Sequence, residues 1–331
     1  MGPPPRLAVL ANPAAGRGAA GRTARTVADR LTAAGSAVSL LVGDTADHSR
    51  RLVADAVGAG VDGVVVVGGD GIVHLAVQAL AGTSTALGLV PSGTGNDFAR
   101  ALGIPRRHPV AATELVLAGH RRSIDLARLD APGAPPDGPR DVSDGPPGAV
   151  AAHRWFDGVM TAGFDSRVTA RANRMRRPRG SVRYVLAVLA ELHDTAPVEL
   201  AIEVDGRVHT HRATLAAVGN TAYYGGGIAM CAGAEPDDGL LDVVVVDRVS
   251  PGTLLALFPL AAVGRHLRLP VVTRYRGREV RLSSPSGADL LTHADGEPFA
   301  RLPVALTCVP GALQVYAAPS APTEPDRAAR G

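Results

Sequence analysis

Apolar residues gather in short runs through the first third of the chain, and segments with helical spacing of apolar positions separate these runs. The runs are expected strands, and the segments between them are expected helices. Short all-apolar strands that alternate with helices are typical of a parallel sheet covered on both faces. We therefore predict an α/β domain, with strands at 7–11, 38–42, 64–67 and 86–91 and helices at 21–34 and 49–59.

The pattern changes near Ile124, and strands dominate the rest of the chain. Residues 198–206 alternate apolar and polar positions, and they end in Asp205-Gly206, which is a hairpin signal. Two helical segments, 181–193 and 252–266, interrupt the strands. Further strands are expected at 212–220, 240–247, 279–282, 304–308 and 313–316. This pattern predicts a second domain that is mainly an antiparallel β-sandwich.

The expected domain limits follow from this change of pattern. Residues 1–123 form the α/β domain, which the last strands, at about 303–318, rejoin, and residues 124–302 form the sandwich. The stretch 131–149 is rich in Pro, Gly and Asp, so we expect a disordered loop within the second domain. The Pro/Ala/Arg-rich stretch 319–331 is expected to be a frayed tail.

Composition excludes several classes of function. The chain is 46% hydrophobic and 20% charged, which is ordinary for a globular protein with large cores. A net charge of +3 and 3% aromatic residues give no case for binding nucleic acid. No apolar run is long enough to span a bilayer, and the first residues lack a signal peptide. Cys231 and Cys308 form no CxxC motif, which indicates reduced thiols and a cytoplasmic protein.

A first glycine-rich turn follows the strand expected at 64–67. Gly68, Gly69 and Gly71 let the backbone turn sharply and approach a ligand closely. We expect a helix to begin at Ile72 or Val73, and its N-terminus would favour a phosphate. The Asp70 carboxylate would repel a bare phosphate, so it suits Mg²⁺ or a sugar hydroxyl better. The alternative interpretation is a glycine-rich turn with a structural role only.

Two similar turns follow neighbouring strands. Residues 91–100, PSGTGNDFAR, come directly after the strand at 86–91 and open a helix, where capping is the alternative explanation for one polar residue. Residues 12–18, NPAAGRG, follow the first strand and are a weak signal alone. Ligands bind beyond the carboxyl ends of parallel strands. The three turns together therefore predict a nucleotide site.

Six motifs in order span nearly the whole chain: NPAAGRG, GGDGI, PSGTGNDFAR, GNTAYYGGG, EPDDGLLDV and DGE. This set resembles the diacylglycerol kinase catalytic domain family, in particular the bacterial lipid kinases related to sphingosine and ceramide kinases. The resemblance implies an α/β domain like that of NAD kinases and phosphofructokinases, a β-sandwich second domain, and ATP in the cleft between them.

The resemblance also implies a set of site residues. Glu297 or Asp295 of the DGE motif would be the general base, with Glu297 favoured, and Asp97 would belong to the Mg²⁺ and phosphate network. A structural Mg²⁺ would be bound by the Asp238 carboxylate and the carbonyls of Glu235 and Leu240. The residues implied to bind ATP are Asn12, Pro13, Ala14, Ala15, Gly16, Gly68, Gly69, Asp70, Gly71, Gly93, Thr94 and Asn96.

We therefore predict an ATP- and Mg²⁺-dependent lipid kinase that phosphorylates the hydroxyl of a diacylglycerol-like or sphingoid lipid. A carboxylate can take the hydroxyl proton, and positioning with charge neutralisation supplies the rest. The expected location is the inner face of the membrane, with peripheral contact, and a homodimer is left open. An arginine cluster would face anionic lipid, the alternative being a solvated loop; its members are Arg171, Arg174, Arg176, Arg177 and Arg179.

The chain departs from the family pattern in the first turn. Ile72 replaces a threonine, Leu75 replaces a glutamate, and strict spacing puts Gly43 rather than Thr45 where a nucleotide-contacting threonine is frequent. These changes support the alternative that the chain is a catalytically weak or dead nucleotide or lipid sensor of the same fold. A small-molecule kinase of the NAD kinase type is a further alternative, but it would lack the PSGTGNDFAR and DGE pair. No histidine spacing indicates zinc.

Overall fold

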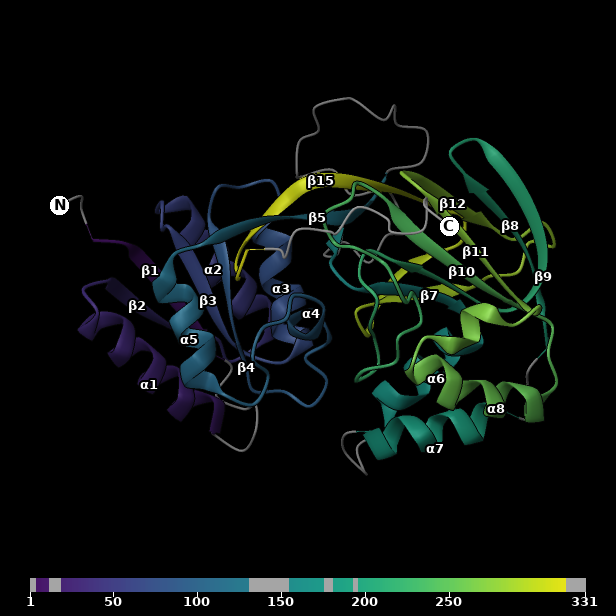
Figure 1. Ribbon diagram of the computed structural model, residues 1–331, viewed down its shortest axis with the longest axis horizontal. Coiled ribbons are helices and arrows are strands. Elements are labelled where there is room, and N and C mark those ends of the chain that lie inside the picture. Colours follow the sequence, from purple (N-terminus) through teal and green to yellow (C-terminus); the bar gives the residue numbers. More distant parts are fainter. Residues whose placement is uncertain (1–3, 12–18, 131–154, 176–180, 193–195, 320–331) are drawn as a thin grey trace, which may run out of the picture.

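The computed structural model describes residues 4–11, 19–130, 155–175, 181–192 and 196–319, which form two lobes side by side (Figure 1). The loop predicted at 131–149 and the tail beyond Pro319 lie outside the described residues. A single sheet of 15 strands runs through both lobes. The predicted combination of an α/β domain and a mainly antiparallel sandwich is confirmed, whereas the exact domain limits stay a prediction.

The first lobe is a parallel sheet in the order β2-β1-β3-β4, with helices around it (Figure 1). Every residue of β3 and β4 is buried, which is why both strands are apolar without alternation. The strands are β1 (Arg6–Ala11), β2 (Ala37–Val42), β3 (Gly63–Gly68) and β4 (Ala86–Pro91). The helices are α1 (Ala19–Ala33), α2 (Ala46–Gly58), α3 (Asp70–Leu80), α4 (Asp97–Ala101) and α5 (Pro109–Ala118).

Two long strands, β5 (Arg121–Leu129) and β15 (Val304–Tyr316), connect the lobes. They pair with each other along most of their length, while β15 also pairs with β4 in the first lobe and β12 in the second. The prediction of separate strands at 304–308 and 313–316 is wrong. Pro310 and Gly311 resemble a turn in the sequence, but the structure accommodates them in an irregularity of one continuous strand.

The second lobe is antiparallel, and its strands follow the path β14-β13-β7-β9-β8-β12, with β10 and β11 joined through β9. The predicted hairpin is confirmed, because β8 and β9 pair around Asp205-Gly206. The strands are β6 (Trp155–Phe156), β7 (Val159–Gly163), β8 (Val198–Val204), β9 (Arg207–Gly219), β10 (Leu241–Asp247), β11 (Val272–Gly277), β12 (Glu279–Ser283), β13 (Leu291–Ala294) and β14 (Glu297–Arg301).

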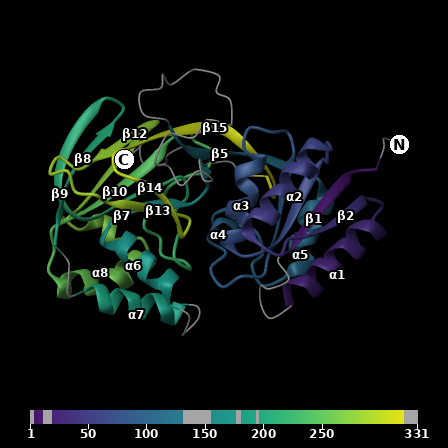
Figure 2. The ribbon, with the colours of Figure 1, turned by 180° about the vertical axis from the view of Figure 1, so that it is seen from behind.

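Three helices pack on one side of the second lobe (Figure 2). They are α6 (Phe164–Arg174), α7 (Ser181–Glu191) and α8 (Pro251–Ala262). The helix predicted at 252–266 ends earlier than expected, because Gly264 takes a left-handed conformation with φ 72° before a short 3-10 turn. Cys231 and Cys308 are both buried, and neither is in a disulfide.

Candidate active site

A cavity of about 840 Å³ is lined by residues of both lobes. The first lobe contributes Asp70, Gly71, Thr94, Gly95, Asp97 and Phe98. The second contributes Asp157, Gly158, Val159, Thr161, Thr169, Asn173, Met175, Tyr223, Tyr224, Gly225, Gly226, His293, Asp295, Gly296 and Glu297. The structure therefore brings the ends of β3 and β4 together with the DGE motif around one cavity.

The two glycine turns of the first lobe touch each other. A Cβ on Gly93 would lie 2.5 Å from the Gly69 Cα atom, so the turns approach more closely than side chains would allow. Gly68, Gly69 and Asn96 line a small cavity behind the turns and not the large one. These glycines therefore serve in part to let the two turns pack against each other.

Asp70 fastens the first turn to the second. Its carboxylate accepts hydrogen bonds from the main-chain N–H groups of Asn96 and Asp97, both at 2.7 Å. Burial raises the pKa of the Asp70 carboxyl, while these two N–H groups act in the opposite direction. Helix α3 begins at Asp70 itself, two residues before the predicted start, with Gly69 as the residue that precedes the helix.

Asn96 opens α4 without acting as a side-chain cap. It has a left-handed backbone with φ 53°, and its side chain bonds both the N–H and the carbonyl of Gly93. The capping alternative for this residue is therefore wrong, because its polar atoms hold the second turn closed. Capping does explain Thr45, whose hydroxyl accepts a hydrogen bond from the His48 N–H at the start of α2.

Asp97 connects the lobes across the cavity. Its Oδ2 atom accepts a hydrogen bond of 2.7 Å from the Gly226 N–H. Its Oδ1 atom is buried and accepts no hydrogen bond from the described residues, and it forms an ion pair with Arg100, whose Nε atom is 3.7 Å away. Burial, followed by the nearby Asp70 charge, raises the pKa of Asp97 to about 6. A buried carboxylate oxygen that accepts no hydrogen bond and borders the main cavity suits Mg²⁺, which prefers oxygen ligands.

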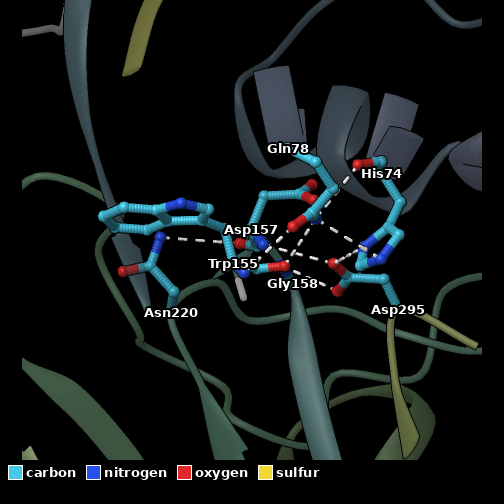
Figure 3. Close-up of polar contacts among 7 residues, drawn as sticks. All are labelled: His74, Gln78, Trp155, Asp157, Gly158, Asn220 and Asp295. Atoms are coloured by element: carbon cyan, nitrogen blue, oxygen red, sulfur yellow. Dashed lines mark hydrogen bonds and ion pairs between the residues drawn. The ribbon is translucent and has the colours of Figure 1, made fainter. Parts of the chain in front are cut away.

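Asp295 lies between the lobes and is held from several sides (Figure 3). Its Oδ2 accepts from the Asp157 N–H at 3.2 Å and lies 2.9 Å from His74 Nδ1, and its Oδ1 accepts from the Gly158 N–H at 3.0 Å. Burial alone would raise the pKa of the Asp295 carboxyl, but His74 and the other donors lower it below its ordinary value. Burial and then the Asp295 charge raise the pKa of Asp157 well above its usual range.

Glu297, the other candidate base, is exposed and lines the main cavity. Desolvation by its surroundings raises the pKa of the Glu297 carboxyl, His74 acts in the opposite direction, and the Asp295 charge adds to the rise. Glu297 also borders a second cavity of about 280 Å³, which is lined as well by Arg50 on α2 and by two of the departures from the family pattern, Ile72 and Leu75. The two replaced residues therefore line one cavity together with the candidate base.

The turn predicted to bind a structural Mg²⁺ lies at β5 and β15, away from the main cavity. Asp125 accepts hydrogen bonds from the N–H groups of Gly239 and Gly311, at 2.7 and 2.8 Å. The Asp238 carboxylate accepts from the Leu240 N–H at 3.0 Å and forms an ion pair with Arg276. A cation bound through Glu235, Asp238 and Leu240 would have to compete with Arg276 for the Asp238 carboxylate, and this metal site stays a prediction.

The predicted ATP-binding residues Asn12 to Gly16 all lie outside the described residues. So do three members of the arginine cluster, Arg176, Arg177 and Arg179. Of the remaining cluster members, Arg171 forms an ion pair with Glu191, so part of its charge is neutralised within the lobe.

Sequence reasoning missed His74, Gln78 and Asp157. His74 and Gln78 are spaced one helical turn apart directly after the glycine turn, and this was the only available signal for them. Asp157 sits in a Trp-Phe-Asp-Gly stretch that matches no motif of the six.

The comparisons with known proteins agree with this arrangement. Residues 6–129 match the diacylglycerol kinase catalytic domain, and residues 158–317 match the YegS C-terminal NAD kinase beta sandwich-like domain. A diacylglycerol kinase of Mycobacterium tuberculosis is 40% identical over 311 residues, which cover 94% of each chain. A probable lipid kinase YegS-like protein of Xanthomonas oryzae pv. oryzae is 30% identical, covering 81% of this chain and 82% of that one.

Solved structures share the fold. A putative diacylglycerol kinase from Bacillus anthracis superposes with a TM-score of 0.73 at 20% identity, over 95% of this chain and 97% of that chain. The family models and the curated relatives together make the chain a lipid kinase in class. It belongs to the diacylglycerol kinase catalytic domain family. In the described part of the chain, every helix is too short or too polar to cross a membrane.

Proposed function

We propose that this lipid kinase transfers the γ-phosphate of ATP to the hydroxyl of a diacylglycerol-like or sphingoid lipid. The observation that carries the proposal is the single cavity into which the two glycine turns and the DGE carboxylates all open. Glycine turns at the ends of parallel strands suit phosphates, and carboxylates suit a proton acceptor and a cation. The acceptor would be reached by peripheral contact at the inner face of the membrane.

We assign the general base to Glu297. Both oxygens of Asp295 already accept hydrogen bonds, and its pKa is lowered, which makes it a weak base. Glu297 is exposed to the cavity and its pKa is raised, which moves it toward the range that general bases need. Its carboxylate would take the lipid hydroxyl proton as that oxygen bonds to the γ-phosphorus, while the bond from phosphorus to the ADP oxygen breaks.

Asp97, whose buried Oδ1 atom accepts no hydrogen bond from the described residues and is ion-paired with Arg100, would hold Mg²⁺. When bound, that ion would neutralise phosphate charge. Asp70 would act indirectly, because its carboxylate is occupied by the main chain of Asn96 and Asp97 and so fixes where Asp97 lies. Thr94 and Gly95 line the same cavity and would face the phosphates.

The test is transfer of label from γ-labelled ATP, with Mg²⁺, to a panel of lipids in mixed micelles: diacylglycerol, sphingosine, ceramide, monoacylglycerol and phosphatidylglycerol. Labelled lipid that is lost in Glu297→Gln would support both the reaction and the base. Bound ATP without transfer to any lipid would instead support the sensor alternative, for which the changed wall at Ile72 and Leu75 is the motivating observation.

A further inference from the structure

A buried histidine of β13, His293, lines the main cavity. Its main chain lies between two paired strands, because His293 pairs with Thr161 on β7 and with Pro298 on β14. Helix α6 packs against β7 and β13, and the imidazole extends toward this helix (Figure 2). There the Ser166 hydroxyl contacts the ring, with its Oγ atom 2.6 Å from the Nδ1 atom of His293.

The Ser166 hydroxyl determines which ring nitrogen of His293 carries the proton. Ser166 Oγ also forms a hydrogen bond with the main-chain carbonyl of Leu291, and the serine is the donor there, because a carbonyl oxygen can only accept. A hydroxyl has a single hydrogen, so Ser166 can only accept from His293. The Nδ1 atom of His293 therefore carries a proton and donates it to Ser166.

The second ring nitrogen, Nε2, is consequently a hydrogen-bond acceptor. Burial lowers the pKa of His293 to about 4, so the ring is neutral at neutral pH and its one proton is the one on Nδ1. In the described part of the chain no donor is bonded to Nε2. Because Nδ1 is turned to α6, Nε2 is the polar atom that the ring can offer to the cavity.

Two neighbours on the same cavity wall use their donors within the protein. The Tyr224 hydroxyl donates to Oδ1 of Asp165 at 2.7 Å, and Nδ2 of Asn173 donates to the Gly296 carbonyl at 2.7 Å. A buried acceptor that is left without a donor costs free energy. The molecule that best suits this wall therefore brings a donor of its own to His293.

We propose that His293 is a specificity-determining residue, whose Nε2 atom accepts a hydrogen bond from an N–H or hydroxyl of the acceptor lipid other than the hydroxyl that is phosphorylated. His293 pairs with Pro298, the residue after the proposed base Glu297, so both side chains reach the cavity from one hairpin. The proton on Nδ1 does not depend on the proposed function, whereas the choice of lipid rests on it.

The favoured acceptors are lipid alcohols with a second donor close to the reacting hydroxyl. Sphingosine and ceramide have a nitrogen-bound hydrogen and a second hydroxyl there, and monoacylglycerol has a second hydroxyl. Diacylglycerol has only ester oxygens beside its reacting hydroxyl, and these cannot donate. Within the proposed range of substrates, His293 therefore favours the sphingoid lipids and monoacylglycerol over diacylglycerol.

The proton position is tested by ¹⁵N NMR of the ring nitrogens in the full chain, without nucleotide or lipid. His293→Phe identifies the His293 signals by their disappearance. We expect a protonated Nδ1 and a bare Nε2 in the wild type, and a proton shifted toward Nε2 in Ser166→Ala. Ser284→Ala, a serine of the same lobe that also donates to a carbonyl, should leave the pattern unchanged. A wild-type ring protonated at Nε2 would overturn the proposal, and no response to Ser166→Ala would overturn the role of the serine.

Lipid preference is tested in the labelled-ATP assay with two acceptors that differ by one hydroxyl, 1-monoacylglycerol and the monoacyl ester of 1,3-propanediol. In the wild type, kcat/KM should be about ten- to a hundredfold higher for monoacylglycerol, because the propanediol ester leaves Nε2 unpaired. In His293→Phe, which keeps an aromatic ring without the acceptor, the two values should agree within about threefold. Ser166→Ala should give an intermediate ratio. His266→Phe, at a buried histidine bonded to the Met230 carbonyl, should keep the wild-type ratio.

The same ratio in wild type, His293→Phe and Ser166→Ala would overturn the proposal, as would a change confined to the KM for ATP. A wild type that phosphorylates neither acceptor would contradict the proposed function. The role of His293 would then be decided by calorimetric titration of the nucleotide-free chain with micelles of each acceptor. Tighter binding of monoacylglycerol that is lost in His293→Phe would support the proposal, and equal binding of both acceptors by the wild type would overturn it.

Discussion

Gly69 and Gly93 meet backbone to backbone, so that a Cβ on Gly93 would lie 2.5 Å from the Gly69 Cα and 3.2 Å from its nitrogen. The neighbours on the first turn are main-chain atoms, which cannot rotate away. This contact joins the carboxyl ends of β3 and β4, and it explains why the two turns carry glycines even where they do not face the cavity.

Gly93→Ala should therefore destabilise the fold by about 1–3 kcal/mol, the usual cost of overpacking. The measurement is the free energy of unfolding from urea denaturation. Gly58→Ala is the matched control, because its Cβ would meet nothing within 4 Å and its φ is not positive. Gly58 closes α2, so alanine there should be neutral or slightly stabilising. Equal stability of Gly93→Ala and wild type would contradict the packing argument.

The pH dependence of kcat should report on the two carboxylates of the DGE motif. A base must be deprotonated, and Glu297 has a raised pKa, so activity should rise with pH above the ordinary glutamate range. Glu297→Gln should lose about 10²–10⁴-fold in kcat. Asp295→Asn removes a charge that raises the pKa of Glu297, so the rising limb should move to lower pH. A limb that disappears in Asp295→Asn and persists in Glu297→Gln would assign the base to Asp295.

The ionised Asp97 carboxylate should lower the free energy of unfolding when no cation is bound. Burial raises its pKa from an ordinary 3.8 to about 6, so between these values the folded chain binds more protons than the unfolded chain. Stability from this group is therefore lost as pH rises from about 4 to about 6. Asp97→Asn avoids that loss and can still accept from the Gly226 N–H. It should gain up to about 3 kcal/mol over wild type at pH 8, and almost none at pH 4.

Urea denaturation at the two pH values, without nucleotide or Mg²⁺, measures this difference. The same variant should lose the stabilisation that Mg²⁺ and ATP give the wild type. Lower stability of Asp97→Asn than of wild type at pH 8 would mean that Arg100 and the Gly226 N–H satisfy the charge in the folded chain, which contradicts the role assigned to the Oδ1 atom.

The parts of the fold that the sequence predicts are those with local causes. The four valines before Gly68 form a strand buried on both faces, and the alternation in 198–204 gives a strand with one buried face. The glycine turns were predictable because backbone conformation and close approach are encoded in the residue itself. These elements can be predicted without knowing which distant residues they contact.

The contacts that complete the site have distant causes. His74 and Asp295 are 221 residues apart, and Asp97 and Gly226 are 129 apart, so no local pattern relates them. The single strand β15 was predicted as two, because Pro310-Gly311 is a turn signal whose outcome depends on Asp125 accepting the Gly311 N–H. The resemblance indicated which carboxylates belong to the site, but not which of their oxygens already accept hydrogen bonds.

Ile72 should weaken ATP binding if the family threonine contacts phosphate. Ile72→Thr restores a hydroxyl on the wall shared with Glu297 and is expected to improve ATP affinity by about 1 kcal/mol, the net value of one hydrogen bond. Ile72→Val is the matched control, because it shortens the side chain without adding a hydroxyl. Calorimetric titration with Mg²⁺ and ATP measures both. The same gain in the valine variant would show that space at this position, and not the hydroxyl, limits binding.

Mg²⁺ at the turn of Glu235, Asp238 and Leu240 should compete with Arg276, since the ion pair already neutralises the Asp238 carboxylate. Thermal unfolding without ATP should therefore show weak stabilisation by Mg²⁺ in the wild type, more in Arg276→Gln, and none in Asp238→Asn, because a ligand stabilises only the state that binds it. Asp237→Asn, a neighbouring ion-paired aspartate, serves as the control and should respond as the wild type does. An equal response in Asp238→Asn and wild type would place the stabilising ion elsewhere, and an unchanged response in Arg276→Gln would show that the arginine does not block the site.

The competition matters because Asp125 holds this turn against β15 through Gly239 and Gly311, so a cation there would stiffen the junction between the lobes without touching the cavity.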